Sequence, residues 1–197
     1  MSASARPVAV LFARADSIYK ALPSADVWDE ARDARLWPGG APVVAHPPCR
    51  GWGKLRRFAR PLPGELGLGP WAVEQVRKHG GVLEHPAHST LWSAAGLPPP
   101  GQADAWGGWT LPILQHWWGH RAAKATWLYV VGCAPAAIPP IPLVLGRAGH
   151  VCCGTRMRRG SQGWRPEITK AEREHTPRAL AEWLLDLARR TQMEEPQ

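Results

Sequence analysis

Short apolar runs separated by turn residues dominate the first half of the chain. Residues 7–13 (PVAVLFA) and 41–45 (APVVA) are continuous apolar runs, typical of strands buried on both faces of a sheet, and residues 25–28 form a further short strand candidate. Residues 66–78 have helical spacing and end at a glycine pair, after which another strand begins at Val82. Strands that alternate with helical patterns predict an α/β fold with a mostly parallel sheet.

The second half is less regular. A loop rich in proline and glycine at residues 97–108 leads into expected strands at 110–116 and 124–131. A basic, glycine-containing loop follows at 146–166, with a candidate strand at 150–153. This half is therefore expected to add strands to the sheet and a long polar loop.

The last element has the clearest periodicity. We expect a helix over 176–190, with Thr176 as its cap and Pro177 in the first helical position. Its apolar residues recur with the helical period of 3.6: Leu180, Trp183, Leu184, Leu187 and Ala188. We predict one compact domain over residues 1–191 and a frayed tail at 192–197.

Composition narrows the class of protein. The 197 residues include 21 prolines and 20 glycines, which favours a compact, loop-rich domain, and the formal net charge of +8 permits a nucleic-acid partner. The four cysteines show no disulfide-scaffold spacing, which indicates a cytoplasmic protein. No apolar run approaches the ~18 residues that span a membrane. We therefore expect no membrane association, and no obligate protein partner is evident.

The first candidate for chemistry is the segment His46-Pro47-Pro48-Cys49, which directly follows the expected strand at 41–45. A thiol at the carboxyl end of a buried strand stands where open α/β sheets bind ligands. The neighbouring Arg50 makes the loop electropositive, which favours the nucleophilic thiolate. The alternative is that Cys49 is a small buried apolar residue after a proline turn.

A second candidate is Glu84, which ends the next strand within Glu84-His85-Pro86. Because this repeats the geometry of Cys49, both strand ends are expected to face one cleft. A buried glutamate can accept a hydrogen bond from the exocyclic amine of a base or, when protonated, donate to a ring nitrogen. The alternative is a surface glutamate that caps a turn.

The third candidate is the block from Gln115 to Leu128, in which tryptophans alternate with basic residues. Such a pattern suits phosphate contacts combined with base stacking, with Arg121 and Lys124 as the cations. The alternative is that the tryptophans belong to the core and the cations are solvated. The histidines and cysteines form no complete ligand set with zinc spacing, so no metal site is expected.

Together these motifs resemble the cytosine-C5 DNA methyltransferases, and more closely the shortened relatives found in bacteriophage genomes. The resemblance extends over residues 7–145. It implies a Rossmann-like, methyltransferase-type sheet in one compact domain, and host cytoplasm as the location if the chain is phage-encoded. Three motifs carry it: Pro47-Pro48-Cys49, Leu83-Glu84-His85-Pro86, and Gln115…Gly119-His120…Lys124-x-Thr126-x-Leu128.

The resemblance also implies roles for individual residues. Cys49 would attack C6 of a flipped-out cytosine and Glu84 would hold the base, so that C5 accepts a methyl group from S-adenosylmethionine. The implied partner is DNA or a pyrimidine nucleotide. The residues expected near the substrate are His46, Pro48, Arg50, His85, Arg121 and Lys124, and those expected near the cofactor are Phe12, Asp26 and Asp29.

One departure from the family keeps two further functions open. The family has a glycine-rich cofactor loop after its first strand, whereas residues 11–16 here contain no glycine. This favours an enzyme that modifies a nucleotide or base without S-adenosylmethionine. A third interpretation is a catalytically degenerate protein that only binds nucleic acid through its positive charge.

Overall fold

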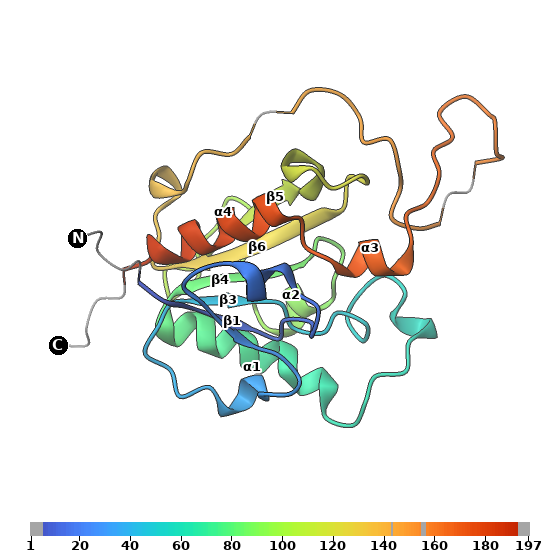
Figure 1. The fold of residues 1–197 in the computed structure, drawn as a ribbon. Helices are drawn as coiled ribbons and strands as arrows, with labels where there is room; N and C mark the ends of the chain where they lie inside the picture. Colours follow the sequence, from blue (N-terminus) through green and yellow to red (C-terminus); the bar gives the residue numbers. More distant parts are fainter. Residues whose placement is uncertain (1–5, 143, 155–156, 193–197) are drawn as a thin grey trace.

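The computed structural model describes residues 6–142, 144–154 and 157–192. These residues form a single α/β domain built on a six-stranded sheet (Figure 1). Its strands are β1 (Val8–Leu11), β2 (Ala25–Trp28), β3 (Val43–Ala45), β4 (Gly81–Pro86), β5 (Trp109–Leu114) and β6 (Ala125–Val131). The helices are α1 (Glu65–His79), α2 (Leu91–Ala94), α3 (Lys170–Glu174) and α4 (Arg178–Arg189). The predicted α/β class is confirmed.

The strand order is β2-β1-β3-β4-β6-β5. The first four strands of this order are parallel, whereas β6 runs antiparallel to β4, and β5 runs antiparallel to β6. The sheet is therefore mixed but mostly parallel. Because β6 reverses direction, its first residues lie at the same edge as the last residues of β1, β3 and β4.

Two helices cover the sheet, one on each face (Figure 1). Helix α1 packs with Ala9 and Leu11 of β1, and α4 packs with Val8 and Val10 of the same strand. All four residues of β1 have no exposed surface, which explains why the strand is a continuous apolar run and not an alternating one.

The helix boundaries differ in part from the prediction. Helix α4 begins at Arg178, and Pro177 occupies the cap position without a side-chain hydrogen bond, so the prediction of Thr176 as the cap is wrong. The five-residue helix α3 was not predicted; a reciprocal capping box between Thr169 and Glu172 stabilises it. The candidate strand at 150–153 is reduced to isolated bridges.

The edge of the sheet at the carboxyl ends of the parallel strands is surrounded by irregular segments. Figure 1 shows α3, the loop that precedes α1 and the long loop that follows residue 146 gathered at this end of the molecule, away from the two termini. In the described part of the chain, no helix combines the length and apolar character required to traverse a bilayer.

Candidate active site

Two neighbouring parallel strands carry the residues singled out in the sequence. Strand β3 pairs with β4 so that Ala45 lies opposite Leu83, and the next residues along the two strands are His46 and Glu84. The Nδ1 atom of His46 lies 3.1 Å from Oε2 of Glu84. The ends of the two strands therefore lie side by side at His46 and Glu84, while the expectation that Cys49 and Glu84 face one cleft stays a prediction.

Both oxygens of the Glu84 carboxylate are engaged. Besides the His46 contact at Oε2, Oε1 accepts a 2.9 Å hydrogen bond from Nε2 of Gln115. The same amide nitrogen lies 3.1 Å from Oγ1 of Thr126, and Gln115 has no exposed surface. Gln115 stood in the tryptophan-rich block of the sequence but was not predicted as a site residue. Its place right after β5 brings it to the same edge as Glu84.

Tyr19 extends this chain of hydrogen bonds. Its hydroxyl oxygen lies 3.0 Å from Nε2 of His46. When His46 is neutral and donates from Nδ1 to Glu84, Nε2 accepts the Tyr19 proton. Tyr19 is 1% exposed, and its burial together with the charge of Glu84 raises the pKa of the phenol well above its ordinary value. Tyr19 thus fixes the orientation of the His46 ring.

Glu84 is an anion in this environment. Burial by itself raises the pKa of a carboxyl group, but here the hydrogen bond from His46 and the electrostatic effects of His46 and Lys124 outweigh it and lower the pKa of Glu84 to about 2. The side chain is only 13% exposed. The site therefore presents an oriented acceptor and not a proton donor.

Cys49 is exposed and follows His46 in the same loop, and its thiol lies within electrostatic range of this carboxylate. The surrounding protein and the negative charge of Glu84 raise the pKa of its thiol, against an opposing effect of Lys124. The expectation that Arg50 promotes the thiolate is wrong, because Nε of Arg50 forms a 2.8 Å ion pair with Oε1 of Glu65. Cys49 is consequently a thiol at neutral pH until a ligand or a cation changes its surroundings.

The other residues expected near the substrate divide into two groups. Lys124 stands just before β6, donates from Nζ to the carbonyl of His175 at 3.2 Å and acts electrostatically on both Cys49 and Glu84. Pro48 immediately precedes Cys49 and is half-buried. Arg121 instead forms an exposed two-point ion pair with Glu172 of α3, with N–O distances of 2.7 and 2.6 Å.

The structure does not bring His85 to this group. Successive residues of a strand point to opposite faces of the sheet, so His85 points away from Glu84. It has no exposed surface, its ring packs edge-on against Trp92, and neither ring nitrogen has a hydrogen-bond partner among the described residues. Burial lowers the pKa of His85 to about 4, so the ring is neutral.

The tryptophan-rich block belongs largely to the core. Trp118 is 6% exposed and packs against Trp183 of α4, while Trp117 and Trp127 are half-buried against the two core clusters. The interpretation as core is therefore correct for Trp118, whereas Trp117 and Trp127 are only partly buried, and base stacking by this block stays a prediction.

The residues expected near a nucleotide cofactor are already engaged by the protein itself. Both oxygens of Asp26 accept hydrogen bonds, from Trp28 and Arg32, at 2.7 and 2.6 Å. Asp29 is 6% exposed, forms a 2.6 Å ion pair with Lys20 and caps two backbone N–H groups. Each oxygen of both carboxylates therefore already has at least one partner within the protein.

The loop after β1 shows the same pattern. Phe12 adopts a left-handed conformation (φ 62°) and packs edge-on against Trp71, while Arg14 bonds to both Asp16 and Glu174. These contacts hold the glycine-free loop against α3. The residues expected near the cofactor are thus held in contacts within the protein, and S-adenosylmethionine stays an untested expectation.

No group of three or more metal-ligating side chains stands close enough to hold an ion within the described ranges. Comparisons of this chain with protein-family models, with curated proteins and with solved structures find no match.

Proposed function

We propose that this protein is a DNA-modifying enzyme that activates C5 of cytosine through a covalent adduct with Cys49, in the manner of the methyltransferases that it resembles. One observation carries the proposal. An ionised, buried glutamate, oriented by His46 and Gln115, lies within electrostatic range of an exposed thiol at the carboxyl edge of an α/β sheet, where such folds bind their ligands.

The chemistry follows from these two groups. Glu84 accepts a hydrogen bond from the exocyclic amine and holds the base in place. After the Cys49 thiol has lost its proton to solvent, the thiolate adds to C6; the π pair of C5=C6 forms a C4=C5 bond, the π pair of C4=N3 moves onto N3, and N3 takes a proton from solvent. C5 is then a nucleophilic enamine carbon. For exchange, C5 gains a solvent proton and loses its original one; N3 then returns its proton to solvent, the C5–C6 double bond re-forms, and the thiolate leaves.

The second reactant is a separate question. The resemblance implies S-adenosylmethionine, which would supply an electrophilic methyl group, but Asp26 and Asp29 are paired within the protein and we derive no step through it. Their engagement by Arg32 and Lys20 favours a second candidate function, base modification without this cofactor. The assignment of this α/β fold to the methyltransferase type belongs only to the first candidate function, the enzyme that uses S-adenosylmethionine.

Exchange of the C5 hydrogen in heavy water tests the activation step without any cofactor. The wild-type protein is expected to introduce deuterium at C5 of cytosine in an oligonucleotide, as measured by mass spectrometry of the nucleosides. Cys49→Ser is expected to abolish the exchange, because an alcohol is a far weaker nucleophile than a thiolate at neutral pH. The matched control is Cys133→Ser, since this thiol is buried in the core.

Three outcomes separate the interpretations. Exchange that persists in Cys49→Ser contradicts the mechanism. Exchange in the wild type without measurable binding of S-adenosylmethionine by calorimetry selects the cofactor-independent enzyme. Tight DNA binding by the wild type, Cys49→Ala and Glu84→Ala alike, with no exchange in any of them, selects a binding protein. Mass spectrometry of DNA from expressing cells then identifies the modified base.

A further inference from the structure

A cavity of about 540 Å³ opens beside the second half of α1. Four side chains line it: Glu74, Arg77 and Lys78 of α1, and Trp106 of the loop before β5. Pockets of this size hold ligands as large as a nucleoside. None of these four residues belongs to the candidate active site.

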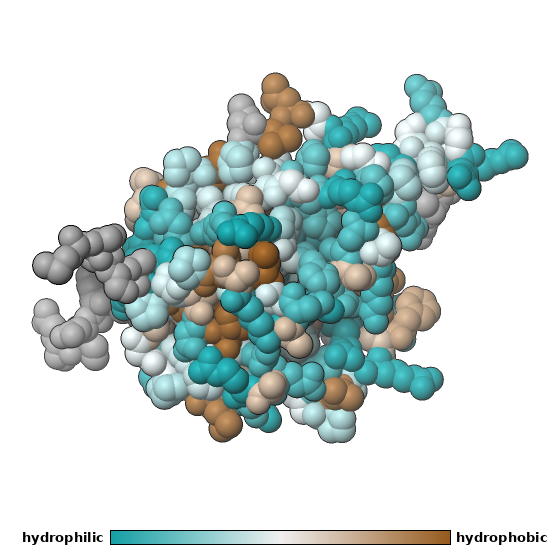
Figure 2. Space-filling model, in the orientation of Figure 1, coloured by the Kyte–Doolittle hydropathy of each residue, from teal (hydrophilic) through white to brown (hydrophobic). Residues whose placement is uncertain are grey.

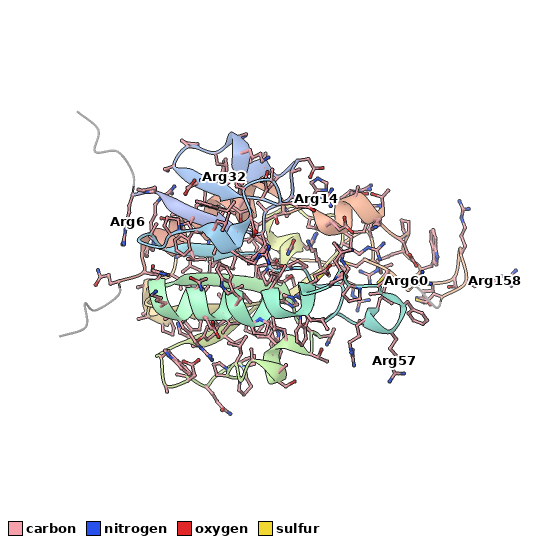
Figure 3. All side chains as sticks on the ribbon, turned by 90° about the horizontal axis from the view of Figure 1, so that it is seen from below. Arg6, Arg14, Arg32, Arg57, Arg60 and Arg158 are labelled. Carbon is pink, nitrogen blue, oxygen red and sulfur yellow. The ribbon has the colours of Figure 1, made fainter. Side chains whose placement is uncertain are left out.

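The cavity and the candidate active site lie toward opposite ends of the sheet. Helix α1 ends at His79 and β4 begins at Gly81, so the second half of α1 lies near the amino ends of the parallel strands. Figure 3 looks onto α1 and shows Arg57 and Arg60 at the end of the molecule where this helix begins, with Arg6 at the other end. The first of these ends, from which hydrophilic side chains project in Figure 2, is that of the candidate active site. The cavity is therefore a separate site.

Trp106 is an exposed ring on a fixed turn. One carboxylate oxygen of Asp104, Oδ1, accepts hydrogen bonds from the backbone N–H groups of Trp106 and Gly108, at 3.0 and 2.9 Å. The backbone N–H of Gly107 donates to the carbonyl of Asp104 at 3.0 Å. Although the turn is held by these bonds, the side chain of Trp106 is 55% exposed. Its indole is therefore a flat surface, already in position, on which a planar ligand can stack.

Arg77 packs against this ring and is itself held by the protein. Its Cζ lies 3.8 Å from the centre of the Trp106 ring. Nε donates to the hydroxyl of Tyr129 at 3.1 Å, and Nη2 donates to Oδ2 of Asp104 at 3.2 Å. In contrast, Nη1 has no hydrogen-bond partner in the described part of the chain and is not buried. The guanidinium is therefore fixed in place with two N–H groups left for a ligand.

Two charged side chains of α1 complete the lining. Glu74 and Lys78 stand about one helical turn apart, and both are exposed. Neither takes part in an ion pair within the described residues. The cavity thus offers a hydrogen-bond acceptor at Glu74, donors at Lys78 and Arg77, and a flat ring at Trp106.

These groups match a planar ligand with acceptors on one edge and donors on another. Guanine has this arrangement, because O6 and N7 are neighbouring acceptors, whereas N1 and the 2-amino group carry hydrogens. Arginine and lysine donate to O6 and N7 of guanine, and a carboxylate can accept from N1 and the 2-amino group. In adenine an amino group replaces O6, so a donor would face the cations. The lining therefore favours guanine over adenine.

We propose that this cavity binds the guanine base of a free nucleotide. Trp106 stacks on the base, and Glu74 accepts from N1 and the 2-amino group. Arg77 and Lys78 donate to O6 and N7. A single stacking ring favours a mononucleotide, because single-stranded nucleic acid is bound by successive aromatic side chains along a basic groove. This site is independent of the chemistry proposed for the Cys49 thiol.

Isothermal titration calorimetry of the wild type with four nucleotides tests the base contacts. Guanosine monophosphate is expected to bind about tenfold more tightly than inosine monophosphate, which lacks the 2-amino group, or 7-deazaguanosine monophosphate, which lacks the N7 acceptor. Adenosine monophosphate carries the same phosphate and is expected to bind more weakly still. Equal affinities for guanosine and adenosine monophosphates overturn the proposal. Binding of a guanine-containing oligonucleotide without binding of guanosine monophosphate overturns it as well.

Variants of the lining residues then locate the site. Trp106→Ala is expected to weaken the binding of guanosine monophosphate about tenfold, because the stacking surface is lost. Its control is Phe58→Ala, which removes an exposed ring from the loop before α1. Glu74→Ala is expected to equalise the affinities for guanosine and inosine monophosphates, whereas a general loss of structure would weaken both by the same factor. Its control is Glu182→Ala, which removes an exposed glutamate of α4.

The outcomes separate this proposal from the proposed function. Equal binding of guanosine monophosphate by Trp106→Ala and Phe58→Ala overturns the assignment to this cavity. Loss of binding in Glu84→Gln also overturns it, since the nucleotide would then occupy the candidate active site. Binding that is retained in Glu84→Gln and weakened in Trp106→Ala supports a separate guanine site, whether or not the protein exchanges the C5 hydrogen of cytosine.

Discussion

The two halves of the strand-end edge differ in what their carboxylates contact. At the β1–β2 half, Asp26 and Asp29 are each paired with a cation, Arg32 and Lys20 respectively. At the β3–β4 half, Glu84 receives its hydrogen bonds from an imidazole and an amide, and it acts electrostatically on the exposed thiol of Cys49.

This difference separates two aspartates that stabilise the fold from a glutamate that can contact a ligand. An aspartate neutralised by its own arginine or lysine stabilises a loop and offers little to a ligand. A glutamate that is kept ionised by orienting donors, beside a nucleophile, has both charge and position available for a substrate. The edge therefore carries an oriented, ionised acceptor in one half, which the proposed base chemistry requires, and carboxylates paired with cations of the protein in the other.

The largest expected effect comes from changing one carboxylate in each half. Glu84→Gln is expected to lower C5 exchange by about 10²–10³-fold, since it removes the charge that holds the exocyclic amine. Asp29→Asn keeps an acceptor for the two backbone N–H groups that Asp29 caps and is expected to leave exchange within about twofold. Equal losses of C5 exchange in Glu84→Gln and Asp29→Asn would contradict the difference proposed between the two halves of the edge.

The pH dependence of exchange sharpens the comparison further. Because the pKa of the Cys49 thiol is raised, the thiolate fraction and the rate should increase about tenfold per pH unit across the neutral range. The low pKa of Glu84, about 2, means that its protonation does not limit the rate there. Lys124→Met removes a charge that lowers the pKa of Cys49, so its profile should shift to higher pH. A profile that falls between pH 6 and 8 would contradict these assignments.

The fold was predictable where burial leaves a pattern in the sequence. β1 and β3 are apolar on both faces because α1 and α4 cover both sides of the sheet, and α4 has its apolar residues at helical spacing. α3 was missed because its sequence, KAERE, has no apolar period. Its capping box, Thr169-x-x-Glu172, was a visible signal that could have located it.

The site was predictable only in part, for a different reason. Cys49 follows one apolar strand and Glu84 was expected to end the next. Their position at the same edge of the sheet could therefore be inferred from the sequence. Tyr19 and Gln115 reach the site through contacts across 27 and 31 residues, which no local pattern records. His85 was misassigned because strand geometry turns it to the face opposite Glu84.

A smaller effect on exchange is expected from Tyr19, which ends the series of hydrogen bonds that runs through His46 to Glu84. Tyr19→Phe keeps the ring in the core and removes only the hydroxyl that contacts Nε2 of His46. The His46 ring, which is no longer held at Nε2, can reorient. The rate of C5 exchange should therefore fall about 5–10-fold, which corresponds to roughly 1 kcal/mol of activation free energy. The pH profile should keep its slope, because Cys49 is unaffected. The control Tyr129→Phe alters a buried hydroxyl that contacts Asp104 and Arg77 instead, and exchange in it should match the wild type.

The smallest effect concerns His85, which shares β4 with Glu84 but faces α1. Its pKa is about 4 in the folded protein against an ordinary value of 6.5, because burial disfavours the charged ring. Below pH 6.5 the unfolded chain takes up this proton first, so stability should decline as the pH falls from 6.5 to about 4. His85→Leu should remove this part of the decline and, since both ring nitrogens lack partners in the described structure, raise the free energy of unfolding at pH 7 by about 1 kcal/mol. Urea denaturation at several pH values measures both. A destabilised His85→Leu at pH 7 would show instead that the ring nitrogens have partners, and would reopen a role for this residue at the edge.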